Sequence, residues 1–339
     1  MRRRSGSCQV EALRGEHVES VHEVSIAVAD ADGRLRAHAG DPDRCTFARS
    51  SIKAMQALPL VEDGVVERFG ITEEELALCC ASHSGEPRHI QLAGSLLGRI
   101  AAGEEALACG PHWPMSPAAA QLLREAGEQP GRLHNNCSGK HAGMLALARF
   151  HGWPLAGYHQ PEHPVQQRML REVARWSRLD ADDIRLGVDG CGVVTYAVPL
   201  FGLARGFAGL AAEARRGGMG AATVIQAMVR HPWVVGGSDR LCTELMKAAA
   251  GRIFVKVGAE GVYGAGVPGA ELGVALKVHD GAGRAAEPAL LATLQALGLL
   301  SADELGKLGR WLTPPVTNTR GEEVGNVRCR IELATTERS

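Results

Sequence analysis

Ser50 and Lys53 form a Ser-x-x-Lys pair that could supply a nucleophile. The spacing of Ile52, Met55 and Leu58 predicts a helix, on which residues three positions apart lie one above the other. The Lys53 amine would then reach the Ser50 hydroxyl and, once it has lost its own proton, could accept the hydroxyl proton. The motif is equally compatible with a capped surface helix that carries a solvated lysine.

Lysine is rare in this chain, which favours a chemical role for some of the lysines. Only six of the 37 Lys and Arg residues are Lys. Arginine stays protonated, whereas a lysine can lose its proton and act as a base or a metal ligand. Lys256, at the end of an expected strand, could lower the pKa of the Lys53 amine as a second cation. Penicillin-recognising enzymes combine Ser-x-x-Lys with a comparable Lys-Thr-Gly strand, although a strand-end lysine can also be purely structural.

A polar loop after an apolar segment supplies a second hydroxyl. Ser82, in Ser82-His83-Ser84, could shuttle a proton or act as an alternative nucleophile, and His83 could orient a substrate. Residues of these types also occur in turns, where they hydrogen-bond their own backbone.

Two thiols lie on turns that contain glycine, Cys137 in Cys137-Ser138-Gly139-Lys140-His141 and Cys191 in Asp189-Gly190-Cys191-Gly192. Two such thiols could meet in space and bind zinc, with His141 as the conventional third ligand. Lys140 is the unconventional third ligand, because it must first lose its proton. Buried cysteines also occur simply as small hydrophobic residues.

The composition disfavours several function classes. The 339 residues carry a formal net charge of −1 and only 4% aromatic residues, which argues against basic patches and base-stacking surfaces for nucleic acid. No apolar run reaches the length of a membrane span, and the N-terminal segment lacks the apolar core of a signal peptide. The nine cysteines are odd in number and scattered, which fits reduced thiols. We therefore expect a cytoplasmic protein that binds neither nucleic acid nor membranes.

The elements that would position these residues differ between the ends and the middle of the chain. Short strands are expected at residues 21–39, 252–280 and 327–333, and helices fill the middle. This order predicts an α/β (α+β) fold with a mostly antiparallel sheet flanked by helices. We expect one domain over residues 1–339, with a possible sheet lobe made of 1–60 and 231–339 and a mainly helical lobe at 61–230.

Local signals predict several boundaries of these elements. The helix at Ser50 should stop or kink at Pro59, and the capping-box pattern that begins at Thr72 predicts a helix to residue 80. Residues 231–237, which begin with His-Pro, are expected to form a loop.

Five segments together resemble the rhizobial-type (class 3) L-asparaginases, also called the asparaginase II family. The segments occur in the family's order at residues 48–54, 81–86, 136–141, 188–192 and 256–261, and the resemblance extends over about residues 20–335. It implies a serine β-lactamase-like and glutaminase-like fold, a homodimer, and hydrolysis of L-asparagine to L-aspartate and ammonia. The family pattern pairs Ser50 with Lys53 and Ser82 with Lys256.

The family's zinc site would correspond to Cys137, Lys140 and Cys191. We expect this zinc to be structural or to position the substrate, and not to be essential to the chemistry.

The expected mechanism begins with attack of Ser50 on the side-chain amide carbon, with Lys53 as base, and passes through a β-aspartyl acyl-enzyme. Which serine attacks first is left open. The substrate's charged groups need partners of opposite charge: Arg49 suits the α-carboxylate, Glu86 or Asp189 could hold the α-ammonium, and His141 is a further polar candidate.

Two alternatives remain for the function. The same Ser and Lys residues could serve a glutaminase or a β-lactamase-like amidohydrolase that acts on another amide. Alternatively, Cys137 and Cys191 could belong to a non-catalytic zinc or thiol protein.

Overall fold

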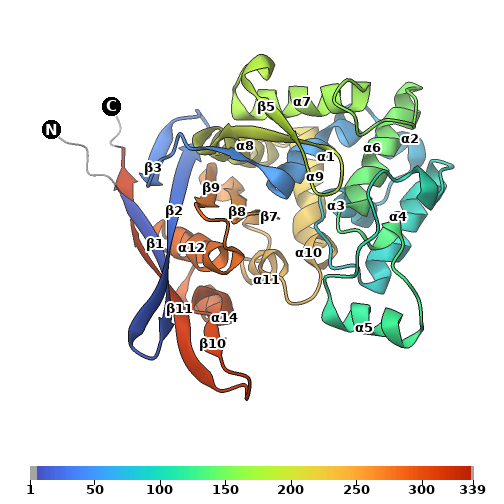
Figure 1. Cartoon of the computed structure of the whole chain (residues 1–339). Coiled ribbons are helices and arrows are strands. Elements are labelled where there is room, and N and C mark those ends of the chain that lie inside the picture. The colour runs from blue at the N-terminus through green and yellow to red at the C-terminus, as the bar shows by residue number, and fades with distance from the viewer. Residues whose placement is uncertain (1–5, 337–339) are drawn as a thin grey trace. The chain divides into compact units, whose positions relative to one another are not determined.

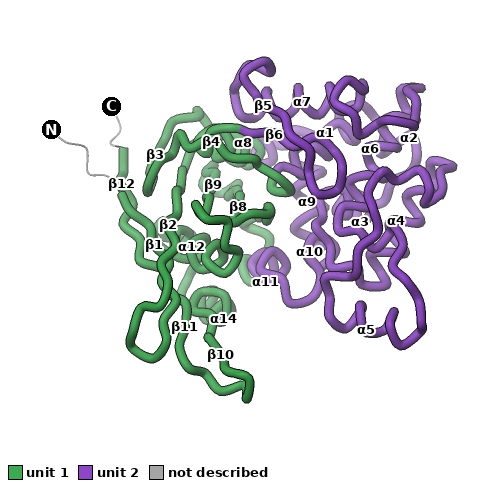
Figure 2. Tube along the Cα trace, in the orientation of Figure 1, with its two compact units in different colours: residues 1–51, 198–212, 248–339 green, residues 52–197, 213–247 purple. Residues whose placement is uncertain are grey.

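The computed structural model describes residues 6–336. It contains two compact units, each assembled from separate stretches of the chain (Figure 2). Unit 1 comprises Met1–Ser51, Val198–Ala212 and Ala248–Ser339, and unit 2 comprises Ile52–Ala197 and Glu213–Lys247.

Unit 1 is built on an antiparallel sheet (Figure 1). Its main strand order is β10 (Pro315–Thr317), β11 (Glu323–Glu332), β1 (Ser7–Arg14), β2 (His17–Asp30), β9 (Leu272–Val278), β8 (Val262–Val267) and β7 (Phe254–Gly258). Beside this path, β3 (Leu35–Ala39) pairs with β2 and with β12 (Ala334–Thr335). The helix α12 (Gly283–Ala296) packs against β1, β9 and β11. The α+β class and the antiparallel sheet are confirmed, and the strands expected at 21–39 form the antiparallel pair β2–β3.

The strand β1 was not predicted, although it lies between β11 and β2 in the sheet. A strand is recognised in a sequence by alternating apolar and polar residues, but the alternation in β1 is short and includes Glu11, a residue type that is depleted in strands. In the fold this carboxylate is only 8% exposed, and it accepts hydrogen bonds from Arg328 at 2.8 Å and Arg330 at 3.0 Å on β11. A polar side chain is therefore accommodated in the strand because the neighbouring strand supplies its partners.

Unit 2 is mainly helical. Its helices are α1 (Lys53–Glu62), α2 (Val65–Phe69), α3 (Glu73–Cys79), α4 (Pro87–Arg99), α5 (Pro117–Glu125), α6 (Ser138–His151), α7 (Pro164–Ser177), α9 (Met219–Arg230), α10 (Pro232–Gly236) and α11 (Leu241–Ala248). The short strands β5 (Arg185–Val188) and β6 (Val194–Pro199) pair antiparallel. Unit 1 also contains β4 (Cys45–Phe47), α13 (Ala302–Lys307), α14 (Gly309–Leu312) and most of α8 (Leu200–Arg215).

The helix α6 lies at the centre of unit 2. Its first eleven residues are all buried, as expected for a helix with neighbours on every side. The helices α1, α3, α4 and α7 pack against it. A site at the start of α6 is consequently shielded from solvent.

Two local predictions are wrong and one is confirmed. The first helix does not stop at residue 58 but continues through Pro59 to Glu62, because burial of the surrounding apolar residues outweighs the lost backbone hydrogen bond. Residues 231–237 contain a short helix, α10, and its proline occupies the favoured first position. The capping box at Thr72 is present as predicted. Within residues 6–336, no helix is both long and apolar enough to cross a membrane.

Candidate functional site

Lys53 makes three polar contacts inside unit 2. It begins α1, and its side chain is fully buried. Its Nζ donates to the carbonyl oxygen of Ala81 at 2.5 Å and contacts Ser82 Oγ at 3.1 Å and Cys137 Sγ at 3.2 Å. An ammonium group has three N–H donors, so these three contacts match a protonated Lys53. If Lys53 loses that proton, Ser82 Oγ is close enough to transfer its own proton to the amine.

Packing fixes the loop that carries Ser82 on both sides. The Ser82 backbone N–H donates to Val235 O at 3.0 Å, and the His83 N–H donates to Asn136 O at 3.3 Å. The Ser84 hydroxyl donates to Gly236 O at 2.8 Å. The loop after α3 is thus held between the α10 segment and the start of α6, and the Ser82 hydroxyl is buried beside Lys53.

A ring stack supports the same loop. His83 and His89 stack with ring centroids 5.0 Å apart, and His89 stacks on Trp233 at 4.3 Å. Because the Gly85 N–H donates to His83 Nδ1 at 3.2 Å, Nε2 must carry the proton that reaches Ser138 Oγ at 2.9 Å. Sequence reasoning missed this stack, since Trp233 lies 144 positions from His89 in the chain.

Ser50, Arg49 and Lys256 belong to unit 1. Ser50 is half-buried on the 3₁₀ turn Arg49–Ile52, directly before α1. Arg49 has a φ of 52°, a left-handed conformation that is unusual for a residue with a side chain. The neighbouring Ser51 hydroxyl is buried and donates to Ala48 O at 2.7 Å, so Ser50 is the more exposed of the two adjacent serines.

Lys256 lies on β7 and is fully buried, and its Nζ donates to Val257 O at 2.8 Å. The strand closely approaches the turn before α1, because a Cβ at Gly258 would lie 2.9 Å from Ala48 O. The predicted pairs, Ser50 with Lys53 and Ser82 with Lys256, remain predictions. The contact of Lys53 with Ser82 and Cys137 was not predicted.

The start of α6 and the β5–β6 turn form a thiol–amine cluster. Lys140 Nζ lies 3.1 Å from Cys191 Sγ, and both side chains are buried. A hydrogen bond from Cys137 and the charge of Lys140 lower the pKa of the Cys191 thiol against the opposing effect of burial. Burial disfavours a charged Lys140, but the sulfur atoms of Cys191 and Cys137 raise its pKa overall. The cluster therefore holds a thiolate against an ammonium group.

The donor set of this cluster fits zinc. Two sulfur atoms and one nitrogen give three ligands and leave a fourth position open. Within residues 6–336, no group of three or more His, Cys, Asp and Glu side chains is arranged to hold a metal. A metal at Cys137 and Cys191 thus depends on Lys140 as its third protein ligand.

His141 follows Lys140 and is fully buried. The Ala108 N–H donates to Tyr158 Oη at 2.9 Å, so the Tyr158 hydroxyl can give its own proton to His141 Nδ1, 2.5 Å away. Burial and the charge of Lys140 lower the pKa of His141 to about 3, so the ring is neutral. With the Tyr158 hydroxyl donating to Nδ1, the ring proton lies on Nε2. Within residues 6–336, that Nε2 atom has no hydrogen-bond partner. In this tautomer Nε2–H is a buried donor that lacks an acceptor among the described residues.

The two carboxylates predicted to bind substrate are both held by backbone groups. Glu86, at the N-cap of α4, accepts from the Ser238 N–H at 2.8 Å and from its hydroxyl at 2.9 Å. Asp189 accepts from the Gly190 N–H at 2.8 Å, and its charge contributes to the raised pKa of Lys140. Asp189 therefore lies close to the thiol–amine cluster, whereas Glu86 follows the Ser82 loop.

One of the comparisons with known proteins covers nearly the whole chain. A sequence model described as L-asparaginase II matches residues 10–329. No curated protein matches the chain. Among solved structures, the chain is similar to one described as Mglu in its native form. The sequence identity is 16% and the TM-score 0.46, over 83% of this chain and 67% of that chain.

Proposed function

The chain belongs to the L-asparaginase II family, which makes it an amidohydrolase, and from this we propose that it hydrolyses L-asparagine to L-aspartate and ammonia. The observation that supports a serine–lysine mechanism is the buried contact of Lys53 Nζ with Ser82 Oγ at 3.1 Å, which places the proposed base beside the hydroxyl proposed to relay its proton. A lysine amine and a serine hydroxyl held together in a dry environment are what a serine–lysine hydrolase requires.

In the proposed reaction, Lys53 acts as the neutral amine, after one of its three N–H protons has passed to solvent. Ser50 Oγ attacks the side-chain amide carbon while its own proton passes to this amine. The C–N bond then breaks, and the proton stored on Lys53 leaves with ammonia, directly or through Ser82. A water molecule next attacks the β-aspartyl ester. Its proton returns to the same amine and then to Ser50, which releases L-aspartate. Lys256, which is also a buried lysine, is proposed as the partner of Ser82, as in the family pattern.

The substrate's α-carboxylate is proposed to bind Arg49 and the Nε2–H donor of His141, which lacks a partner within residues 6–336. Asp189 and Glu86 are the carboxylates proposed for the α-ammonium. Glu86 is oriented for this by Ser238, which donates two hydrogen bonds to it.

Zinc is proposed to bind Cys137, Lys140 and Cys191, where it would connect the two cysteine loops and help to place the amino-acid end of the substrate. The metal would displace the proton of Lys140, whose pKa is raised by the sulfur atoms beside it. Zinc binding should therefore release protons. We also propose that the chain forms a homodimer, which light scattering on purified protein would test. Its proposed location is the cytoplasm.

Ammonia release from asparagine and glutamine, measured alongside acylation of the protein by a β-lactam, tests the function. We expect release from asparagine, a loss of at least about 10³-fold in kcat for Ser50→Ala, and a similar loss for Lys53→Met. Ser51→Ala is the matched control, since the Ser51 hydroxyl is bound to Ala48 O, and it should keep activity within about threefold. Full turnover by Ser50→Ala would identify Ser82 as the nucleophile instead. Acylation by the β-lactam without ammonia release from either amide would favour a β-lactamase-like amidohydrolase.

Zinc titration of the apo protein tests the metal site without turnover. We expect tight binding with release of at least one proton per zinc, followed with a pH indicator. Cys191→Ser should weaken zinc binding at least about 100-fold. Cys45→Ser is the control, because Cys45 is an exposed free thiol on β4 in unit 1. Equal zinc binding by both variants would contradict the site.

A further inference from the structure

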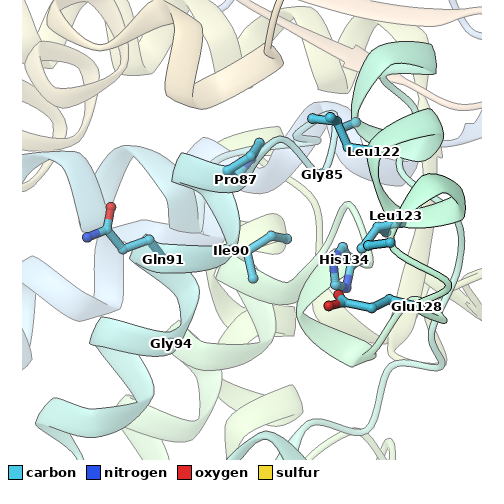
Figure 3. Close-up of a pocket in the computed structure, with 11 residues that line it drawn as sticks. Gly85, Pro87, Ile90, Gln91, Gly94, Leu122, Leu123, Glu128 and His134 are labelled. Carbon is cyan, nitrogen blue, oxygen red and sulfur yellow. The ribbon is translucent and has the colours of Figure 1, made fainter.

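A pocket separate from the buried Lys53 cluster lies between α4 and α5 in unit 2 (Figure 3). Its volume is about 570 Å³, which is within the range of small-molecule sites. Pro87 and Ile90 of α4 form one wall, and Leu122 and Leu123 of α5 form the other. The reaction proposed above does not use this pocket.

The wall of the pocket is shaped by a glycine within a helix. Gly94 lies in the interior of α4, where glycine is a poor helix former. A Cβ at this position would meet no atom within 4 Å, so a side chain would extend into open space. Gly94 thus keeps this part of the pocket clear.

The polar groups of the pocket lie at its edges. Glu128 and His134 belong to the loop that follows α5, and Gln91 lies on the α4 side (Figure 3). The Gly131 N–H donates to His134 Nδ1 at 3.0 Å, so a neutral His134 carries its proton on Nε2 as a donor. Glu128 is an exposed carboxylate that forms no ion pair within residues 6–336. The pocket thus combines an apolar interior with one anionic group at its rim.

We propose that this pocket binds a small organic cation, namely an apolar body that fills the space between α4 and α5 and a protonated amine that faces Glu128. The apolar walls would contribute most of the affinity, and the carboxylate would select the sign of the charge. The pocket also touches the loops of the active site, because Gly85 and His134 line it three residues from Ser82 and Cys137 respectively.

Titration calorimetry with 4-phenylbutylamine and 4-phenylbutyrate tests the proposal on the full chain. Both probes share the apolar body and differ in the sign of the charge. We expect the amine to bind at least about fivefold tighter than the carboxylate, as one partly screened charge pair allows. Glu128→Gln should reduce this preference to less than twofold. A preference that survives Glu128→Gln, or binding of neither probe, would overturn the proposal.

A matched pair of glycine variants tests the location. Gly94→Leu should fill the pocket and weaken amine binding at least tenfold. Gly98→Leu places the same side chain one turn later on α4, also in open space but outside the pocket, and should leave binding unchanged. Both changes favour helix formation, so loss of folding would not imitate the result. Equal affinities in the two variants would overturn the assignment. The proposal would also be overturned if Gly94→Leu, but not Gly98→Leu, dissociated a dimer. The pocket would then be the binding site of a second copy of the chain.

Discussion

Tyr158 shows how one hydroxyl outside the sequence motifs can set the chemistry of a site residue. When its O–H donates to Nδ1 of His141, that atom is the acceptor and the buried Nε2–H is the donor left for a ligand. Without that hydroxyl, a neutral imidazole can carry its proton on either nitrogen. The direction of the His141 donor therefore depends on Tyr158 and, through it, on the Ala108 N–H.

Tyr158→Phe should raise the KM for asparagine about fivefold to tenfold and change kcat less, because the donor serves binding rather than bond cleavage. Steady-state ammonia release measures both constants. Tyr196→Phe is the control, since Tyr196 is also a buried tyrosine and its hydroxyl bonds Gln166 at 3.4 Å. If both variants raised KM equally, the effect would be one of packing and not of the His141 donor.

The element that carries the Ser82 loop, α3, is anchored by one buried carboxylate. Glu75 is 1% exposed and accepts hydrogen bonds from Thr72 N at 2.8 Å and Ser95 Oγ at 2.7 Å, as well as from Arg99 Nε. Burial alone would raise the pKa of Glu75, but these hydrogen bonds lower it overall. The carboxylate thus joins the start of α3 to α4, the two helices on either side of the Ser82 loop.

A lowered pKa in the folded state means that Glu75 stabilises the fold at neutral pH. That contribution is present above the ordinary pKa of 4.5 and is lost as the pH falls through the lower folded-state value. Glu75→Gln should lower the free energy of unfolding at pH 7 by at least about 1 kcal/mol and flatten its decline below pH 4.5. Urea unfolding at several pH values measures this. Glu74→Gln, on the same helix in a half-exposed pair with Arg88, should change both quantities much less.

Signals confined to one element could be read from the sequence, whereas contacts between elements could not. The capping box at Thr72 was predictable because all its atoms lie within four residues. The strand β1 was missed because the partners of Glu11 come from residues more than 300 positions away. For the same reason, the motifs identified Lys53, Ser82 and Cys137 one by one, but not the contact that joins them. The end of the first helix was predicted wrongly at Pro59 because helix propensity depends on the local sequence, whereas the packing that stabilises the helix depends on distant residues.

At the scale of the whole molecule, the chain passes between the two units four times. Neither unit is a continuous stretch, so neither can fold from one uninterrupted segment. We therefore expect the units to unfold together, in one transition. The tryptophans can report on this, because four of the five, Trp113, Trp153, Trp176 and Trp233, lie in unit 2.

A substitution in the core of unit 1 tests this cooperativity. A Cβ at Gly264 on β8 would lie 1.9 Å from the ring of Phe207, which is itself buried and stacked on Phe254. Gly264→Ala should therefore lower the free energy of unfolding by at least about 2 kcal/mol. Tryptophan fluorescence, which reports mostly on unit 2, should shift to lower urea by the same amount as circular dichroism. Gly269→Ala, with open space around its Cβ, should leave both curves in place. Separate transitions in the two signals for Gly264→Ala would show instead that the units unfold independently, despite the four connections between them.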